Sequence, residues 1–123
     1  MNELINADEL PPPRGFSHAV RAGNTVYLAG QIGDGDTLAT QFDNAARNLI
    51  TALTAAGGTP DDLVSLQIFV TDVPEYRASQ RELGEAWRRH FGRRYPTMGL
   101  FGVTDLAVPD AKVELMGIAV ITP

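Results

Sequence analysis

Alternating hydrophobic and polar residues predict five short β-strands along the chain. In Val64–Val70 apolar side chains recur at every second position, which is typical of a strand with one buried face. Ala22-Gly23-Asn24 lies between the first two strands and favours a β-hairpin, because glycine and asparagine adopt turn conformations readily. The turn-rich segment 105–111 separates the last two strands. The predicted strands cover residues 16–21, 25–30, 64–70, 97–103 and 112–121.

Two longer stretches repeat apolar residues every three or four positions, which predicts amphipathic helices. The first is expected to begin at a capping box formed by Thr40 and Asp43 and to end at Gly57-Gly58. The second is expected to begin at Asp72 and to end at Gly92. The order is therefore ββαβαββ, an α+β fold in which two helices pack on one face of a mixed sheet.

The first 13 residues show neither pattern and are predicted to form an irregular arm ending in Pro11-Pro12-Pro13. No repeat or low-complexity tract divides the chain, so residues 1–123 are predicted to form one domain. Hydrophobic residues make up 44% and charged residues 20%, which is typical of globular proteins. The absence of cysteine excludes disulfides, and two distant histidines form no metal-binding pattern. We expect no cofactor and no metal.

Charge and hydropathy limit the partners of the protein. The formal net charge is −5, the opposite sign from a general nucleic-acid binder. The basic residues 88–90 and 93–94 lie at a predicted helix C-terminus, where cations complement the helix dipole. The N-terminus lacks the apolar core of a signal peptide, and no apolar run is long enough to span a membrane. We expect a soluble cytoplasmic protein that binds neither membranes nor nucleic acids.

The last predicted strand is apolar on both faces. One face carries Val113, Leu115, Gly117 and Ala119, and the other carries Met116, Ile118 and Val120. Two helices cover only one face of a sheet, and an antiparallel sheet that faces water normally carries polar residues on its open side. The second apolar face is therefore predicted to be buried against other copies of the chain in a closed oligomer.

Glu114 is the one charged residue in this otherwise apolar strand. Burying an isolated charge is costly, so this carboxyl group must be paired, hydrogen-bonded or protonated. Such groups cluster at functional sites, which makes Glu114 a candidate catalytic residue. The alternatives are a structural ion pair and a carboxylate at the solvated end of the strand.

Four segments of the chain, in the same order, resemble motifs of the RidA family, also called YjgF or UK114. The segments are residues 15–32, residues 53–57, residues 62–72, and the pair 95–103 and 113–120. The resemblance covers about residues 14–120. It implies a chorismate-mutase-like α+β fold, a homotrimer, and small-molecule clefts between subunits. The best-known members of this family are 2-imino/enamine acid deaminases.

The resemblance also implies which residues form the cleft. Glu114 corresponds to a glutamate associated with water handling, and the ligand-binding positions are Phe16, Ala29, Gly30, Gln31, Met98 and Leu100. Three of these positions depart from the family pattern: Phe16 replaces a tyrosine, Ala29 replaces a serine, and Met98 replaces the arginine that binds the substrate carboxylate. Methionine suits apolar ligands, so efficient deamination of 2-imino acids is not expected of this cleft.

Arg14 and His18 lie beside Phe16 in the sequence and are candidates for a replacement cation at the cleft mouth. The alternatives are a solvated loop charge for Arg14 and, for His18, a strand residue satisfied by cross-strand bonding.

Three functions remain open. The protein is a divergent deaminase- or hydrolase-like enzyme in which Glu114 acts as acid–base or orients water. Otherwise it is a non-catalytic metabolite-sensing or partner-binding protein, or an endoribonuclease or translation inhibitor, which its charge disfavours.

Overall fold

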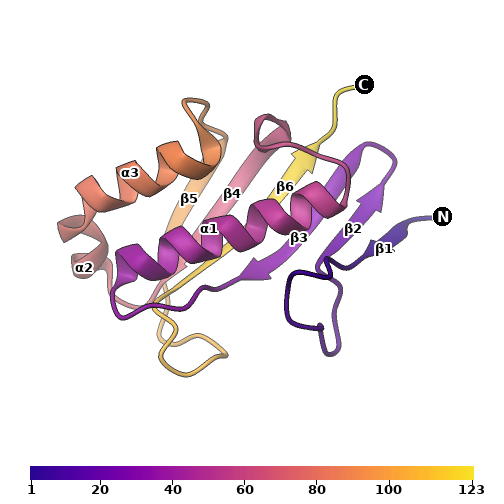
Figure 1. The fold of residues 1–123 in the computed structure, drawn as a ribbon. Helices are drawn as coiled ribbons and strands as arrows, with labels where there is room; N and C mark the ends of the chain where they lie inside the picture. The colour runs from indigo at the N-terminus through magenta and orange to yellow at the C-terminus, as the bar shows by residue number, and fades with distance from the viewer.

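The computed structural model describes all residues from 1 to 123 and contains six β-strands and three α-helices (Figure 1). The strands are β1 (Glu3–Ile5), β2 (Ala19–Ala22), β3 (Thr25–Gln31), β4 (Leu63–Val70), β5 (Thr97–Gly102) and β6 (Val113–Val120). The helices are α1 (Leu38–Ala55), α2 (Val73–Ala78) and α3 (Gln80–Phe91), and a short 3-10 helix, η1 (Pro60–Asp62), precedes β4. None of the helices combines the length and apolarity needed to cross a membrane.

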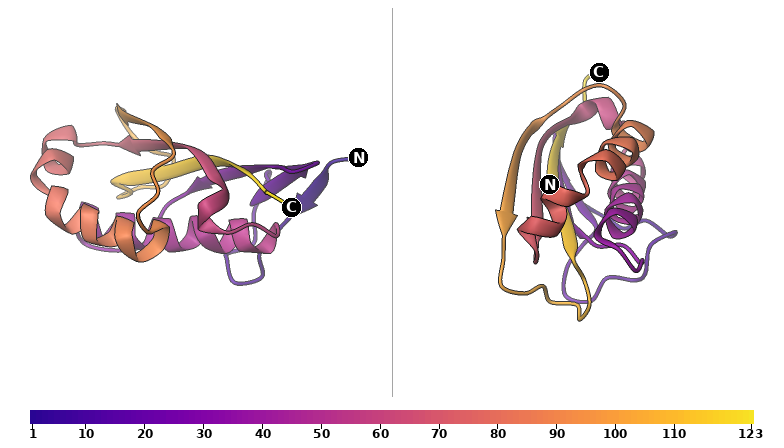
Figure 2. Two further views of the ribbon diagram at one scale, coloured as in Figure 1. Left: turned by 90° about the horizontal axis from the view of Figure 1, so that it is seen from above. Right: turned by 90° about the vertical axis from the view of Figure 1, so that its left-hand side faces the viewer.

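All six strands form one sheet in the order β1-β2-β3-β6-β4-β5, so the last strand lies inside the sheet. β4 and β5 are parallel and are connected through α2 and α3, whereas every other neighbouring pair is antiparallel. The predicted hairpin joins β2 and β3 through Gly23, whose φ of 61° suits glycine. α1 and α3 pack side by side on one face of the sheet (Figure 2), which confirms the predicted α+β fold with a mixed sheet.

The hydrophobic core lies between the helices and the covered face of the sheet. α1 contributes Leu38, Leu49 and Leu53, all of them fully buried, because these residues recur along one side of the helix. They belong to the same buried cluster as Val113 and Leu115 of β6. The apolar stripe predicted for the first helix and the inner face predicted for the last strand are both present.

The opposite face of the sheet has no covering layer within one chain. Met116 and Val120 of β6 keep 40% and 42% of their surface exposed, and Tyr27 of β3 keeps 51%. Phe69 and Phe101 stack across β4 and β5 with ring centroids 5.7 Å apart. We call the surface formed by these five residues the open face. Large apolar side chains gathered on one surface mark an interaction site.

The N-terminal arm is not wholly irregular, contrary to the prediction. Residues 3–5 form β1, which pairs antiparallel with β2 and places Leu4 opposite Val20. Three residues are too few to produce a recognisable alternation, so only the neighbouring strand reveals this element. β2 begins at Ala19, later than predicted. The backbone N–H of His18 instead donates to Asn6 Oδ1 in the arm, at 3.0 Å.

Two helix boundaries also differ from the prediction. α1 begins earlier than expected because Thr37 is its N-cap, with the hydroxyl accepting from the Thr40 N–H at 3.1 Å. The second predicted helix is divided into α2 and α3 at Ser79, whose backbone is not helical. Its predicted ends are both confirmed: Asp72 caps α2, and Gly92, with φ 74°, ends α3.

Candidate functional site

A cleft of about 550 Å³ opens between the N-terminal arm, the end of β3 and the beginning of β6. We call it the arm cleft. Five predicted site residues line it: Phe16, Ala29, Gly30, Gln31 and Glu114. The remaining lining residues are Leu10, Pro11, Pro12, His18, Ile32, Ala107 and Val108. A largely apolar hollow with a few convergent polar groups is the usual form of a small-molecule site.

Glu114 places its carboxylate against the backbone of Gly30. A Cβ atom at position 30 would fall 2.5 Å from Glu114 Oε2 and 2.8 Å from its Cδ, so glycine leaves the space that the carboxylate occupies. The Glu114 side chain is half-buried and belongs to none of the four ion pairs in the chain. Its carboxylate is therefore available to a ligand or a water, and is not part of a structural ion pair within the chain.

An irregularity in β3 brings three consecutive residues to the cleft. The pairing between β3 and β6 shifts register between Leu28 and Gln31, as it does at a β-bulge. Gln31 lies opposite Leu115 and is buried, while Ala29 and Gly30 are half-buried beside it. In a regular strand these neighbours would alternate strictly between the two faces of the sheet. The bulge instead lets all three border the same hollow.

His18 connects the N-terminal arm to the cleft. Its side chain is buried, with only 3% of its surface exposed. Nδ1 accepts the N–H of Ala7 at 3.0 Å, and Nε2 donates to the carbonyl oxygen of Pro11 at 3.0 Å. An accepting Nδ1 belongs to the neutral ring with its proton on Nε2. Both nitrogens are thus satisfied by the arm, so His18 offers no free cation to the cleft. The Phe16 ring lies edge-on to it, with centroids 6.2 Å apart.

Three predicted site residues do not line the arm cleft within one chain. Met98 and Leu100 lie on β5, the edge strand separated from β6 by β4, and keep 47% and 39% exposure. Arg14 is exposed and forms no ion pair. The structure therefore divides the predicted site into a group on β3 and β6 and an exposed group on β5.

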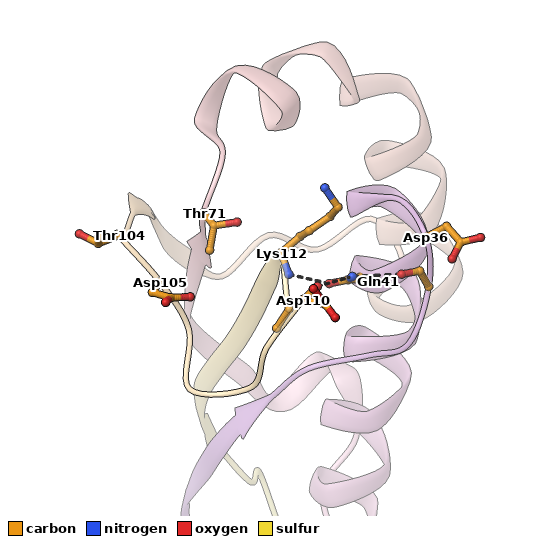
Figure 3. A pocket seen from close by; sticks show the side chains of 9 residues that line it. Asp36, Gln41, Thr71, Thr104, Asp105, Asp110 and Lys112 are labelled. Atoms are coloured by element: carbon orange, nitrogen blue, oxygen red, sulfur yellow. Dashed lines mark hydrogen bonds between the residues drawn. The ribbon is translucent and has the colours of Figure 1, made fainter.

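A second, polar hollow of about 560 Å³ lies beside the start of α1 and the loop before β6 (Figure 3). Gln41 reaches into it from α1: its Nε2 donates to the carbonyl oxygens of Gly35 and Asp110, both at 3.1 Å. Its Oε1 accepts the backbone N–H of Lys112 at 2.7 Å. The Lys112 ammonium is already paired with Glu75 at 3.0 Å. These bonds fasten two loops together. The sequence pattern did not predict these bonds, and the one signal that could have indicated them is a glutamine within the buried stripe of α1.

Part of the predicted basic cluster is used within the structure. Asp43 of α1 accepts from His90 at 2.7 Å and from Arg89 at 3.2 Å, both on α3. Burial by itself would raise the pKa of Asp43, but the hydrogen bonds and charges of these two partners outweigh it and hold that pKa below its usual value. The contact helps to align the two helices.

Known proteins share both the sequence pattern and the fold of this chain. Residues 6–121 match the family model described as Endoribonuclease L-PSP. The chain belongs to the RidA/YjgF/UK114 family. A RutC family protein UK114 of Drosophila melanogaster is 30% identical, over 94% of this chain and 86% of that protein. The resemblance drawn from the motifs is thereby confirmed.

Two further similar proteins are a relative with a named activity and a relative with a crystal structure. A 2-iminobutanoate/2-iminopropanoate deaminase of Dermatophagoides farinae is 29% identical, over 96% of this chain and 95% of that protein. The crystal structure of a YjgF/YER057c/UK114 family member from Mycobacterium tuberculosis has a TM-score of 0.82 at 32% identity, and covers 98% of this chain and 100% of that chain. Membership in the RidA family supports a function directed at small molecules.

Proposed function

We propose that this RidA-family protein forms a homotrimer and acts on a small metabolite with an apolar body, in clefts shared between subunits. The observation that carries the proposal is the position of Glu114. Its unpaired carboxylate lies against Gly30 in a largely apolar hollow. An ionisable group at the wall of such a hollow is a typical acid–base catalyst.

The division of the predicted site supports its completion by a neighbouring subunit. The open face is apolar and uncovered, and a closed cyclic assembly is the usual way to bury such a surface. In a trimer the exposed β5 edge of one subunit would lie beside the arm cleft of the next. Met98 and Leu100 would then form the second wall of that cleft.

The lining favours a less acidic or more apolar ligand than a 2-imino acid. An arginine binds a carboxylate through two charge-assisted hydrogen bonds, each contributing about 1.5–3 kcal/mol. Met98 provides neither bond, and Phe16 and Ala29 carry no hydroxyl groups. The loss of two such bonds corresponds to a factor of about a hundred or more in affinity. The side chains that remain suit an apolar body with one polar end near Gln31 and Glu114.

Glu114 is assigned the acid–base step. In a hydrolytic reaction its carboxylate would take a proton from water as the water oxygen attacks the substrate carbon. The same group would then return the proton to the leaving nitrogen or oxygen. Gln31 would hold the polar end of the substrate, since its amide both donates and accepts.

The deaminase assay tests the choice of substrate. Coupled to an amino-acid dehydratase that releases 2-aminoacrylate or 2-iminobutyrate, the protein should accelerate ammonia release little or not at all. The Dermatophagoides farinae deaminase serves as the positive control. Equal acceleration by both proteins at low concentration would refute the proposed preference. Met98→Arg should recover part of the activity, because it restores a guanidinium at this position.

Glu114→Gln separates an enzyme from a binding protein. The variant keeps the shape of the side chain and removes its ability to take up a proton. On a substrate found by screening neutral imines, enamines and amides, its turnover should fall by about 10²–10⁴. Undiminished turnover would exclude the acid–base role. Tight binding without turnover in the wild-type protein would identify a metabolite-sensing protein instead.

A further inference from the structure

The N-terminal arm forms one wall of the arm cleft, although it lies far in sequence from the other walls. Leu10, Pro11 and Pro12 line the hollow opposite the residues of β3 and β6. Consecutive prolines are stiff because each ring fixes its own φ angle. This wall therefore keeps its shape, and its position depends on how the arm is attached.

Besides the pairing of β1 with β2, the arm is attached through one side chain. The His18 ring receives the N–H of Ala7 and donates to the carbonyl oxygen of Pro11, so it bonds the arm both before and within the segment that lines the cleft. The His18 backbone adds a third bond, to Asn6. Beyond these bonds, Ala7 and Leu10 are buried, and the Leu10 N–H donates to the Ala7 carbonyl oxygen at 3.2 Å.

We propose that neutral His18 is the positioning residue that docks the arm as a wall of the ligand cleft. Nδ1 must accept and Nε2 must donate at the same time, which only the neutral ring with its proton on Nε2 can do. A side chain without this acceptor and donor leaves the Ala7 N–H and the Pro11 carbonyl oxygen without their partner inside a buried contact. Such a substitution therefore undocks the arm and removes one wall of the cleft.

No other ionisable side chain near the ring forms a hydrogen bond or ion pair with the arm. The titratable side chains on the elements around it are Glu3, Asp8, Glu9 and Arg14 of the arm, Arg21 of β2, Tyr27 of β3 and Glu114 of β6. Of these only Glu114 lines the same cleft. His90, the other histidine, is paired with Asp43 between α3 and α1 and does not line the cleft. It provides a matched control.

Amide hydrogen exchange and ¹⁵N NMR of the His18 ring nitrogens test the docking directly. At pH 7.5 the ¹⁵N spectrum of the His18 ring should show the neutral form protonated at Nε2, and the Ala7 and Leu10 amides should be protected. In His18→Phe, which keeps an aromatic ring but can form neither bond, their protection should fall at the same pH. Thermal unfolding checks that the variant is folded, and unchanged protection of the Ala7 amide in it would overturn the proposal.

The link to the ligand rests on the proposed function and is tested with 4-methylpentanamide, a neutral probe with an apolar body. Its affinity for His18→Phe should be about tenfold weaker than for the wild-type protein, because two hydrogen bonds that hold the arm are lost. His18→Gln, whose amide also accepts and donates, should keep most of the affinity, and His90→Gln should keep all of it. Wild-type affinity in His18→Phe refutes the positioning role. Should the wild-type protein not bind the probe, the proposed function fails, and the Ala7 exchange alone decides the docking.

Discussion

Gly30→Ala is the smallest change that should move Glu114. The added methyl group would lie 2.5, 2.8 and 3.2 Å from Oε2, Cδ and Cγ of that side chain. The φ angle at Gly30 lies outside the left-handed region, so alanine fits the backbone without strain. The nearest atoms to the added methyl group all belong to Glu114, so its first effect is expected at the carboxylate.

The required displacement follows from the contact distances. Carbon and oxygen atoms that are not bonded to each other rest at about 3.4 Å or more, so the carboxylate must retreat by about 1 Å. A glutamate side chain absorbs this by rotating about its own bonds, and the fold should lose less than about 1 kcal/mol of stability. A catalytic group displaced by 1 Å, in contrast, costs about a hundredfold in rate.

Turnover of the substrate and thermal unfolding should be measured together. Gly84→Ala is the matched control, because the nearest atom to its added methyl group is 3.7 Å away at the flexible end of Arg88. That control should stabilise α3 by about 0.5–1 kcal/mol and leave turnover unchanged. Wild-type turnover in Gly30→Ala, or a crystal structure with an unmoved Glu114 carboxylate, would refute the reasoning.

Two further predictions concern pH and assembly. The pKa of Asp43 is lowered in the folded state, so its contribution to stability is present above the unfolded pKa of about 3.9 and is lost as the pH falls through the lower, folded value. Thermal unfolding between pH 6 and pH 2 should therefore decline less steeply in Asp43→Asn, and identical slopes would contradict this. Met116→Lys places a charge in the open face and should dissociate the oligomer in sedimentation experiments, whereas the same change at exposed Ala55 on α1 should not. An intact oligomer in Met116→Lys would show that the open face is not the interface.

The elements that depend on neighbouring residues were predictable from the sequence alone. The stripe of Leu49 and Leu53 and the turn at Gly23 act over a few residues, so spacing and residue type are sufficient. The two apolar faces of β6 could also be predicted from the sequence, because side chains in a strand alternate between its faces with a period of two residues. The start of the first helix was predicted at Thr40, and the structure places its N-cap three residues earlier, at Thr37.

The sequence alone was sufficient to predict the first helix, the hairpin, the two-faced last strand and the candidates Glu114 and Gly30. The division of the second helix into α2 and α3, the pairing of β1 with β2, the attachment of the arm by His18 and the distance of two strands between Met98 and Glu114 came only from the folded structure. The reason is physical. A periodic pattern reports which side of an element is buried, but it does not report which distant segment buries it. The arm cleft is built from segments around residues 10, 30 and 114, and only the folded sheet brings them together.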